Sequence, residues 1–241
     1  MSDLILQDQP LLPAIVEKKP VVMNTEKADE FFKNFPKDKV VAYKDYWESI
    51  RPKNNDDIFR RYLFSFMSVH TTWESNVKGY LAVKDFHGWF EDKNKLLQKI
   101  KDSGVGLHNN RTEYIWKFKD QFFANPKDYM ITSKKYHVKK RDSIVEKISG
   151  LGLTKSTFPL ELQLPNEARV VCLDIHLLRL YGCENLKYNK SKSGSQIYRK
   201  IERHWSTSCG RLKVPCYIMR SLYWNSVQKQ ENCRYWSFCL E

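Results

Sequence analysis

The chain has 241 residues, which is enough for one large domain or two small lobes with a substantial core. It carries 41 Lys and Arg against 28 Asp and Glu, for a net charge of +13 and a pI of about 9.4, which favours a polyanionic partner, nucleic acid first, over a merely soluble basic protein. No run of about 18 apolar residues and no signal peptide occur, so we expect an intracellular protein without a membrane segment, whose six cysteines do not form a disulfide framework.

Residues 1–37 form the first predicted segment, an N-terminal arm. The stretch "QPLLPAIVEKKPVV" is rich in proline and shows no clean periodicity, which is typical of an extended arm or a short strap. Residues 1–30 contain three Lys against six acidic residues. The surface that binds a polyanion is therefore expected in the following domain, residues 38–241.

From residue 38 onward the pattern is helical, with few strand-like alternations, and it predicts an all-α chain of roughly ten helices. "DDIFRRYLFSFMSVHTTWESNVKGYLAV" has Asp56 or Asp57 as its predicted N-cap and apolar residues at helical spacing: Ile58, Tyr62, Phe66 and Val69, then Val77 with Leu81.

Four further helices are expected along the rest of the chain. "EDKNKLLQKIKDSG" predicts an amphipathic helix that ends at Gly104, and "NNRTEYIWKFKDQFFANP" predicts one that opens with an Asn cap and ends at Pro126. "VVCLDIHLLRLYG" predicts a buried helix that ends at Gly182, and "SGSQIYRKIERHW" predicts one capped by Ser195.

A glycine hairpin separates "KKRDSIVEKISGLGL" from "STFPLELQL". Gly150 and Gly152 allow a tight turn whose backbone N–H groups would meet a phosphate, and Lys147 and Lys155 flank it with positive charge. A lone Gly-x-Gly is weak support, because it is more often a simple helix C-cap.

The stretch "CLDIH" places Asp174 in an apolar run. A carboxylate in such surroundings is costly unless it caps a helix, pairs with a cation or takes part in catalysis. From the residues alone, the favoured interpretation is that Asp174 caps a helix over residues 175–181. His176, two residues later, is more typical of helix packing than of catalysis.

Together, "GLGLTKSTFPLEL" and "VVCLDIH" resemble the hairpin and catalytic-aspartate segment of the helix-hairpin-helix DNA glycosylase superfamily. "FSFMSVHTTWESNVKGY" resembles an early helix of that superfamily, whose turn lies near the flipped base, and "DSGVGLHNNRTEYIWKF" resembles its glycine- and asparagine-containing helix junction. These segments occur in the right order over roughly residues 56–240. The resemblance implies two helical lobes with a DNA cleft between them.

The resemblance also implies roles for individual residues in an enzyme that extrudes a base from double-stranded DNA. The hairpin and the catalytic aspartate lie within residues 144–182, where Asp174 would be the catalytic carboxylate. Gly150, Gly152, Thr154 and Lys147 would bind a DNA phosphate. The base pocket would be lined by His70, Thr71, Thr72, Trp73 and Asn76, for which ordinary helix packing is the alternative.

One departure from the superfamily concerns the lysine that forms a Schiff base in members that also cleave the strand. That lysine lies two residues after the second hairpin glycine, where this chain has Thr154, and Lys155 is one step further. The simplest interpretation is that the amine nucleophile is absent. A shift of one residue would restore Lys155 to a catalytic role.

The second departure concerns the C-x6-C-x2-C-x5-C loop that holds an iron–sulfur cluster in many relatives. Cys233 and Cys239 match its last pair, and Cys209 and Cys216 have the spacing of its first pair but lie far upstream. We therefore expect a degenerate cysteine loop over residues 209–239, with no metal and no bound cofactor.

Three functions are compatible with this sequence. The first is a monofunctional DNA glycosylase. The second is a thymidine-hypermodifying transferase that attaches a free amino acid to 5-phosphomethyl-deoxyuridine in DNA. It is favoured because the segments resemble those of phage glycosylase-like proteins more closely than those of repair enzymes. That enzyme would be phage-encoded and would act in the host cytoplasm, with Lys155 holding the phosphate. The third is a catalytically inactive DNA-binding module, against which Asp174 argues.

Overall fold

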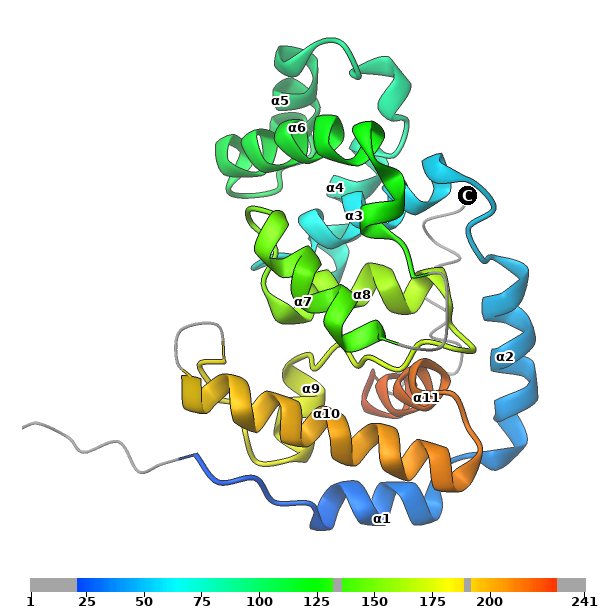
Figure 1. The fold of residues 1–241 in the computed structure, drawn as a ribbon. Coiled ribbons are helices and arrows are strands. Elements are labelled where there is room, and N and C mark those ends of the chain that lie inside the picture. Colours follow the sequence, from blue (N-terminus) through cyan, green and yellow to red (C-terminus); the bar gives the residue numbers. More distant parts are fainter. Residues whose placement is uncertain (1–20, 132–135, 189–191, 229–241) are drawn as a thin grey trace, which may run out of the picture.

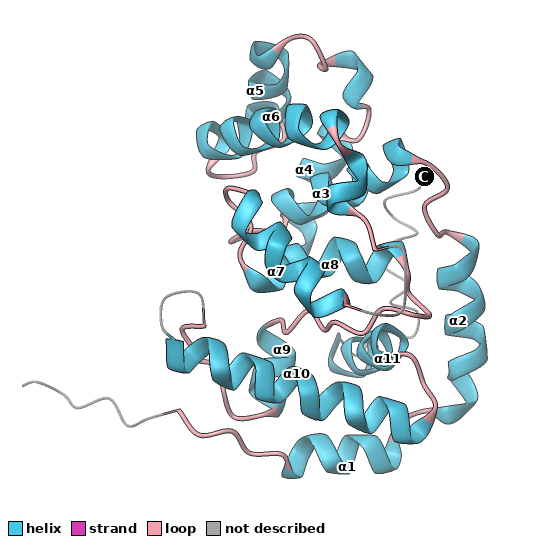
Figure 2. Ribbon diagram, in the orientation of Figure 1, coloured by secondary structure: helices cyan, strands magenta, loops and turns pink. Residues whose placement is uncertain are grey.

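The computed structural model describes residues 21–131, 136–188 and 192–228, and these ranges form helices and loops without a strand (Figures 1 and 2). The prediction of an all-α fold is confirmed. The α-helices are α1 (Glu26–Asn34), α2 (Val40–Ser49), α3 (Asn55–Met67), α4 (Trp73–Val83), α5 (Lys93–Asp102), α6 (His108–Ala124), α7 (His137–Lys147), α8 (Leu153–Gln163), α9 (Ile175–Leu180), α10 (Lys192–Leu212) and α11 (Cys216–Gln228). Short 3-10 turns are η1 (Lys37–Lys39), η2 (Phe86–Gly88) and η3 (Pro126–Tyr129).

The helices form two lobes (Figure 1). Helices α3 to α8 make the upper lobe, in which α3 packs against α4, α6 and α8. Helices α1, α9, α10 and α11 make the lower lobe, and α2 runs along one side, against α11. Among the described helices, none is both long enough and apolar enough to cross a bilayer.

Aromatic rings fill the centre of the upper lobe. Phe59 stacks on Phe118 with ring centroids 5.8 Å apart, and Phe118 in turn lies 4.9 Å from Tyr62. The Tyr62 hydroxyl donates to the backbone oxygen of Tyr129, so a buried polar atom is satisfied. Many of the aromatic residues that a nucleic-acid interface would use are therefore core residues.

The lower lobe includes part of the predicted N-terminal arm. Residues 26–34 form α1 instead of an extended segment, because Phe31 and Phe32 pack their rings against Trp205 of α10 at 6.1 and 4.9 Å. Asp29 also lies 3.3 Å from His204. Residues 1–20 lie outside the described residues, and the boundary at residue 37 stays a prediction.

The predicted helix that begins near residue 56 is divided into α3 and α4 by a turn at residues 68–72. Asn54, and not Asp56 or Asp57, caps α3, because its side chain accepts a hydrogen bond from the Asp57 N–H at 2.8 Å. Thr72 caps α4 in the same way. Periodicity alone places Thr72 in a helix interior, which is why it does not reveal the break.

Other helix ends differ from the predicted ones in a similar way. Helix α6 begins after Leu107, which has a left-handed backbone, so its asparagines lie inside the first turn, although the helix ends before Pro126 as predicted. Helix α10 begins at Lys192, ahead of the predicted cap Ser195, whose hydroxyl donates to the Tyr188 backbone oxygen. Residues 168–174 form a loop, and only α9 of the predicted buried helix is helical.

Candidate active site

The glycine hairpin connects α7 to α8, and its shape depends on Gly150. This residue has φ of +86°, and a Cβ atom there would lie 2.3 Å from the ring of Tyr114 on α6. Ile148 and Leu151 are buried and anchor the turn, whereas Gly150 itself is exposed. The hairpin backbone therefore lies open to solvent next to the N-terminus of α8, which is the arrangement that favours a phosphate.

Lys147 and Thr154 have different positions from those expected of phosphate ligands. Lys147 is exposed and forms an ion pair with Asp128 at 2.7 Å, which raises the pKa of the lysine. The Thr154 side chain is buried: its hydroxyl donates to the Leu173 backbone oxygen at 3.2 Å and lies 2.9 Å from the Tyr188 hydroxyl. The Thr154 hydroxyl is therefore used inside the protein, and the DNA-binding roles of Thr154 and Lys147 stay predictions.

Lys155, one residue further along α8, lines a pocket of about 380 Å³ between the two lobes. Residues from the α3–α4 region, from α8, from the α9 entry and from α11 form its walls: Phe64, Ser68, Thr71, Thr72, Trp73, Asn76, Lys155, Phe158, Cys172, Asp174, His176, Arg220 and Trp224. Thr154 turns inward and Lys155 lies at the pocket, as expected for a site residue, and whether its amine is a nucleophile stays a prediction.

Aromatic rings form the walls of this pocket. Trp73 meets Trp224 edge to face at 5.8 Å, and Phe64 lies 5.6 Å from both Trp73 and Phe158. Such flat apolar walls with a few converging polar groups are suited to an aromatic heterocycle, and an extruded base is one.

Four of the five predicted base-pocket residues line this pocket, namely Thr71, Thr72, Trp73 and Asn76. His70 does not. It lies in a neighbouring hollow of about 390 Å³ with Leu107, Asn110, Arg111, Tyr114 and Gly150 among the lining residues. The cause is its left-handed backbone, φ 51°, which turns the side chain out to solvent.

The turn at residues 68–72 is held by Arg111 of α6, which sequence analysis missed. The buried guanidinium donates to the backbone oxygens of Phe66, Met67, Val69 and Gly106. These include carbonyls at the end of α3 that helix geometry leaves without partners. Arg111 thus fixes the turn that brings Thr71 and Thr72 to the pocket.

Asp174 caps α9 and also faces the pocket. Its Oδ1 accepts hydrogen bonds from the backbone N–H groups of His176 and Leu177 at 3.0 and 2.9 Å. Its Oδ2 lies 3.4 Å from Nη1 of Arg220. Both the capping interpretation and the placement in a candidate site are therefore compatible with one geometry, and His176 contributes to the pocket wall rather than only to packing.

The loop over residues 168–174, which leads to Asp174, has no strand partner among the described residues, and side chains bind most of its N–H groups. The N–H groups of Arg169, Val171, Cys172 and Leu173 donate in turn to His137, Glu202, Glu161 and the Tyr198 hydroxyl. These acceptors come from α7, α8 and α10. Because unpaired buried N–H groups are costly, this set of bonds specifies the path of the segment and hence the position of Asp174.

The surroundings of Lys155 lower the pKa of its amine. Burial is the main cause and Arg220 and Arg111 lower the pKa further, while Asp174 acts in the opposite direction. Burial also raises the pKa of Cys172 to about 12, so its thiol stays protonated at neutral pH. A lysine amine with a lowered pKa next to a carboxylate is a combination that serves nucleophilic catalysis.

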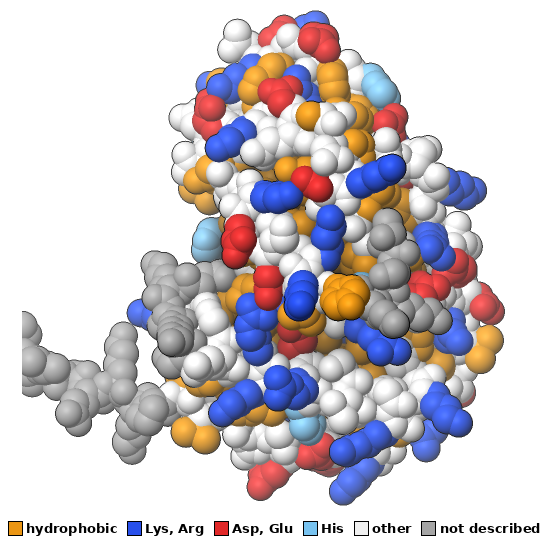
Figure 3. Space-filling view, in the orientation of Figure 1, with side chains coloured by type: hydrophobic (Ala, Val, Ile, Leu, Met, Phe, Trp, Pro, Cys, Tyr) orange, Lys and Arg blue, Asp and Glu red, His pale blue; other side chains and the backbone are white. Residues whose placement is uncertain are grey.

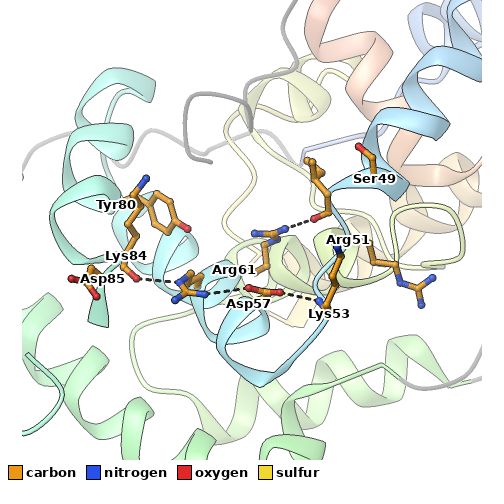
Figure 4. Close-up of a pocket in the computed structure, with 10 residues that line it drawn as sticks. Ser49, Arg51, Lys53, Asp57, Arg61, Tyr80, Lys84 and Asp85 are labelled. Atoms are coloured by element: carbon orange, nitrogen blue, oxygen red, sulfur yellow. Dashed lines mark hydrogen bonds and ion pairs between the residues drawn. The ribbon is translucent and has the colours of Figure 1, made fainter. Parts of the chain in front are cut away.

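A second basic pocket, of about 510 Å³, lies between the α2–α3 loop and the end of α4 (Figure 4). Its arginines are used within the protein: Arg61 donates to the Ile50 backbone oxygen, and Arg60 donates to the Lys84 backbone oxygen and pairs with Asp57. Its guanidinium groups thus support the chain rather than converge on a ligand, and we do not place the active site there.

The cysteines that sequence analysis considered as metal ligands divide into two pairs. Cys209 and Cys216 are buried thiols that interact with each other near the start of α11. Cys233 and Cys239 lie outside the described residues. Within the described ranges, no three His, Cys, Asp or Glu side chains come together as a metal site would require.

Sequence analysis also missed Glu161 and Arg220, a buried ion pair at the pocket. Each stands in an apolar stretch, "FPLELQL" for the acid and "PCYIMRSLYW" for the base. Two opposite charges within apolar runs were the signal that could have indicated their pairing.

Comparison with known proteins agrees with this geometry. The sequence model of a family described as 8-oxoguanine DNA glycosylase matches residues 38–214. No curated protein gave a match.

The face shown in Figure 3 carries many Lys and Arg side chains, spread among acidic ones over both lobes.

Two solved structures share the fold. The 8-oxoguanine DNA glycosylase of Thermotoga maritima aligns with a TM-score of 0.67 at 16% identity, covering 86% of this chain and 99% of the other. The 8-oxoguanine glycosylase/lyase of Methanocaldococcus jannaschii, solved with a 15mer DNA containing 8-oxoguanine, aligns with a TM-score of 0.60 at 20% identity, covering 85% and 96%.

Proposed function

The chain belongs to the 8-oxoguanine DNA glycosylase family, a helix-hairpin-helix family of enzymes that act on DNA bases, and from that premise we propose that it is a bifunctional glycosylase/lyase for an oxidised purine such as 8-oxoguanine. The observation that carries the proposal is that the Lys155 amine and the Asp174 carboxylate line one aromatic-walled pocket beside the hairpin. The relative crystallised with 8-oxoguanine DNA supports the choice of substrate.

In the proposed reaction the neutral amine of Lys155 attacks C1′ of the extruded nucleotide. A bond forms from Nζ to C1′, the bond from C1′ to the base breaks, and the base leaves with the bonding electrons. Asp174 takes the proton that the nitrogen loses and stabilises the positive charge that develops on the sugar. The departing base takes a proton from water. Asp174 returns its proton to the ring oxygen as the C1′–O4′ bond breaks, and the nitrogen lone pair forms the C=N bond of the Schiff base. Water then takes a C2′ proton, the C–H electrons form a double bond between C2′ and C3′, and the C3′–O bond breaks with the phosphate as the leaving group.

The test uses duplex DNA with a single 8-oxoguanine, incubated with the protein in the presence and absence of borohydride. We expect free 8-oxoguanine, a nicked strand and a borohydride-trapped covalent complex. Lys155→Gln abolishes trapping, and Asp174→Asn lowers the rate of base release while DNA affinity is kept. Lys53→Gln, a lysine at the other basic pocket, serves as the matched control and keeps all three activities.

Other outcomes would contradict the proposal in different ways. Base release without trapping would identify a monofunctional glycosylase. Binding without any product, unchanged by Asp174→Asn, would identify a catalytically inactive DNA-binding module.

Transfer of an amino acid to 5-phosphomethyl-deoxyuridine ranks second. It is supported by the presence of two cations in the pocket, Lys155 and Arg220, which suit a base that carries a phosphate. It is weakened because Arg220 already binds Glu161 and lies against Asp174. A parallel incubation with that substrate and a pool of amino acids decides the matter, because a heavier nucleoside with its sugar attached would establish the transferase. An origin in a phage stays a prediction.

A further inference from the structure

A buried ion pair lies at the wall of the candidate active site, between α8 and α11. Arg220 Nη2 is 2.7 Å from Glu161 Oε2, and Arg220 Nε donates to Glu161 Oε1 at 3.2 Å. Glu161 is fully buried and Arg220 is 3% exposed. Two parallel bonds between a guanidinium and a carboxylate fix the orientation of both groups.

The faces of the guanidinium are also covered. Its central carbon lies 5.3 Å from the ring centre of Phe158 and 5.0 Å from that of Tyr217. These cation–π contacts hold the group against rotation out of the plane that Glu161 selects. The remaining nitrogen, Nη1, then lies 3.4 Å from Oδ2 of Asp174.

Asp174 is therefore held from two sides. One carboxylate oxygen is bound by the two backbone N–H groups at the start of α9, and the other lies against Arg220. A helix cap alone would leave the second oxygen to water. With Arg220 present, the carboxylate plane is set by two elements that are far apart in the sequence.

Arg220 also contributes to the charge around Lys155. The charged groups that act on Lys155 are Asp174 from the 168–174 loop, Arg111 from α6 and Arg220 from α11; the neighbouring Cys172 is a neutral thiol. Glu161 offsets much of the Arg220 charge on the buried side, but the Nη1 edge faces the pocket.

We propose that Arg220, oriented by Glu161, is a positioning residue for this reaction: it fixes the plane of the Asp174 carboxylate and places a permanent positive charge beside Lys155. The inference deepens the proposed function and rests on it. A residue of merely structural importance would support the fold in the same way but would leave the titration of Lys155 unchanged.

The experiment compares three variants whose folding is checked by circular dichroism. Arg220→Gln combined with Glu161→Gln removes both charges, so that no lone buried charge remains. Arg220→Lys keeps the charge and loses the bidentate geometry. The matched control combines Lys119→Gln with Asp120→Asn, because Lys119 is also buried, pairs with Asp120 at 3.2 Å and lies over the rings of Phe90 and Trp116, and none of these contacts involves Asp174, Lys155 or residues 168–174.

Two readouts are measured as functions of pH: the rate of borohydride trapping on 8-oxoguanine DNA, and acetylation of Lys155 by acetic anhydride without DNA, followed by peptide mass spectrometry. The acid limb is the low-pH part of each profile, over which the rate rises as Lys155 loses its proton. In the Arg220/Glu161 double variant we expect this limb to move to higher pH by about one unit in both profiles, because loss of the Arg220 charge favours the protonated lysine. We also expect single-turnover trapping to slow by a factor on the order of ten to a hundred. Arg220→Lys slows trapping with the acid limb in place, and the control pair leaves the limb in place.

A folded double variant with the wild-type acid limb and rate would overturn the proposal. If that variant does not fold, a wild-type trapping rate in Arg220→Lys would overturn it instead. The acetylation readout separates this proposal from the proposed function. If the acetylation limb moves but the protein releases no base, the proposed function is wrong and the effect of Arg220 on Lys155 stands. If the protein releases the base but the limb does not move, the proposed function stands and the role of Arg220 is wrong.

Discussion

Replacement of Gly150 by Ala tests whether the hairpin depends on its close approach to α6. An L-residue at φ of +86° bears a backbone strain of about 1–2 kcal/mol. The added methyl group would also lie 2.3 Å from Cδ2 and 2.6 Å from Cγ of Tyr114, so the ring must change rotamer or the hairpin must move. Overpacking of this kind costs about a further 1–3 kcal/mol.

Gly104→Ala is the matched control, because that glycine has φ of +72° but no atom within 4 Å of the position that its added methyl group would take. We expect urea unfolding to show the strain alone for Gly104→Ala, and a larger loss for Gly150→Ala together with weaker binding to duplex DNA. Adding Tyr114→Ala to Gly150→Ala should restore much of the difference. Equal losses for the two glycine variants, with unchanged DNA affinity, would refute the reasoning.

Three further predictions concern the residues around the hairpin and the pocket. Lys147→Gln lowers the slope of log Kd against log salt by about one if this lysine also meets a phosphate, and a binding titration at several salt concentrations that gives the wild-type slope would limit Lys147 to its pair with Asp128. Thr154→Val leaves the Leu173 carbonyl without its donor, so we expect a loss of about 1–3 kcal/mol in urea unfolding with borohydride trapping retained. Loss of trapping in a folded variant would contradict a purely structural role for the Thr154 hydroxyl. Burial raises the pKa of Glu161 to about 7, although the charge and hydrogen bonds of Arg220 lower it. The folded chain therefore binds this proton more tightly than the unfolded chain. The resulting contribution to stability is complete below about pH 4.5 and is lost as the pH rises through 7. Wild type should therefore lose stability relative to Glu161→Gln between about pH 5 and about pH 8 in urea unfolding, and a constant difference would contradict the assigned pKa.

The sequence was sufficient to predict the helical fold and the two most informative site features, Asp174 and the glycine hairpin. Both depend on local rules: a carboxylate in an apolar run must be satisfied nearby, and a tight turn needs glycine. The resemblance predicted the pocket positions of four residues: Thr71, Thr72, Trp73 and Asn76. What could not be predicted were contacts across the fold.

The position of Lys155 is one such case. Counting residues from Gly152 could not decide whether Lys155 reaches the site, whereas in the fold the Thr154 hydroxyl is buried against Leu173 and Tyr188 and Lys155 lines the pocket. The Glu161–Arg220 pair is another, because its members are separated by 59 residues in the chain. The predicted helix ends were wrong where Asn54, Thr72 or the left-handed Leu107 is the N-cap residue, because hydrophobic periodicity does not show the backbone geometry of a single residue.

The loop over residues 168–174 determines at which stage of folding the protein becomes active. Four of its N–H groups are bound by side chains from α7, α8 and α10, and two of those acceptors, Glu202 and Tyr198, belong to α10 of the lower lobe. The hairpin, in contrast, is formed by neighbours in sequence and by α6 of the same lobe. A partly folded chain with only the upper lobe assembled would therefore present a DNA-binding surface without an aligned carboxylate. Such a chain would bind DNA without damaging it, and catalytic competence would arrive together with the docking of the second lobe.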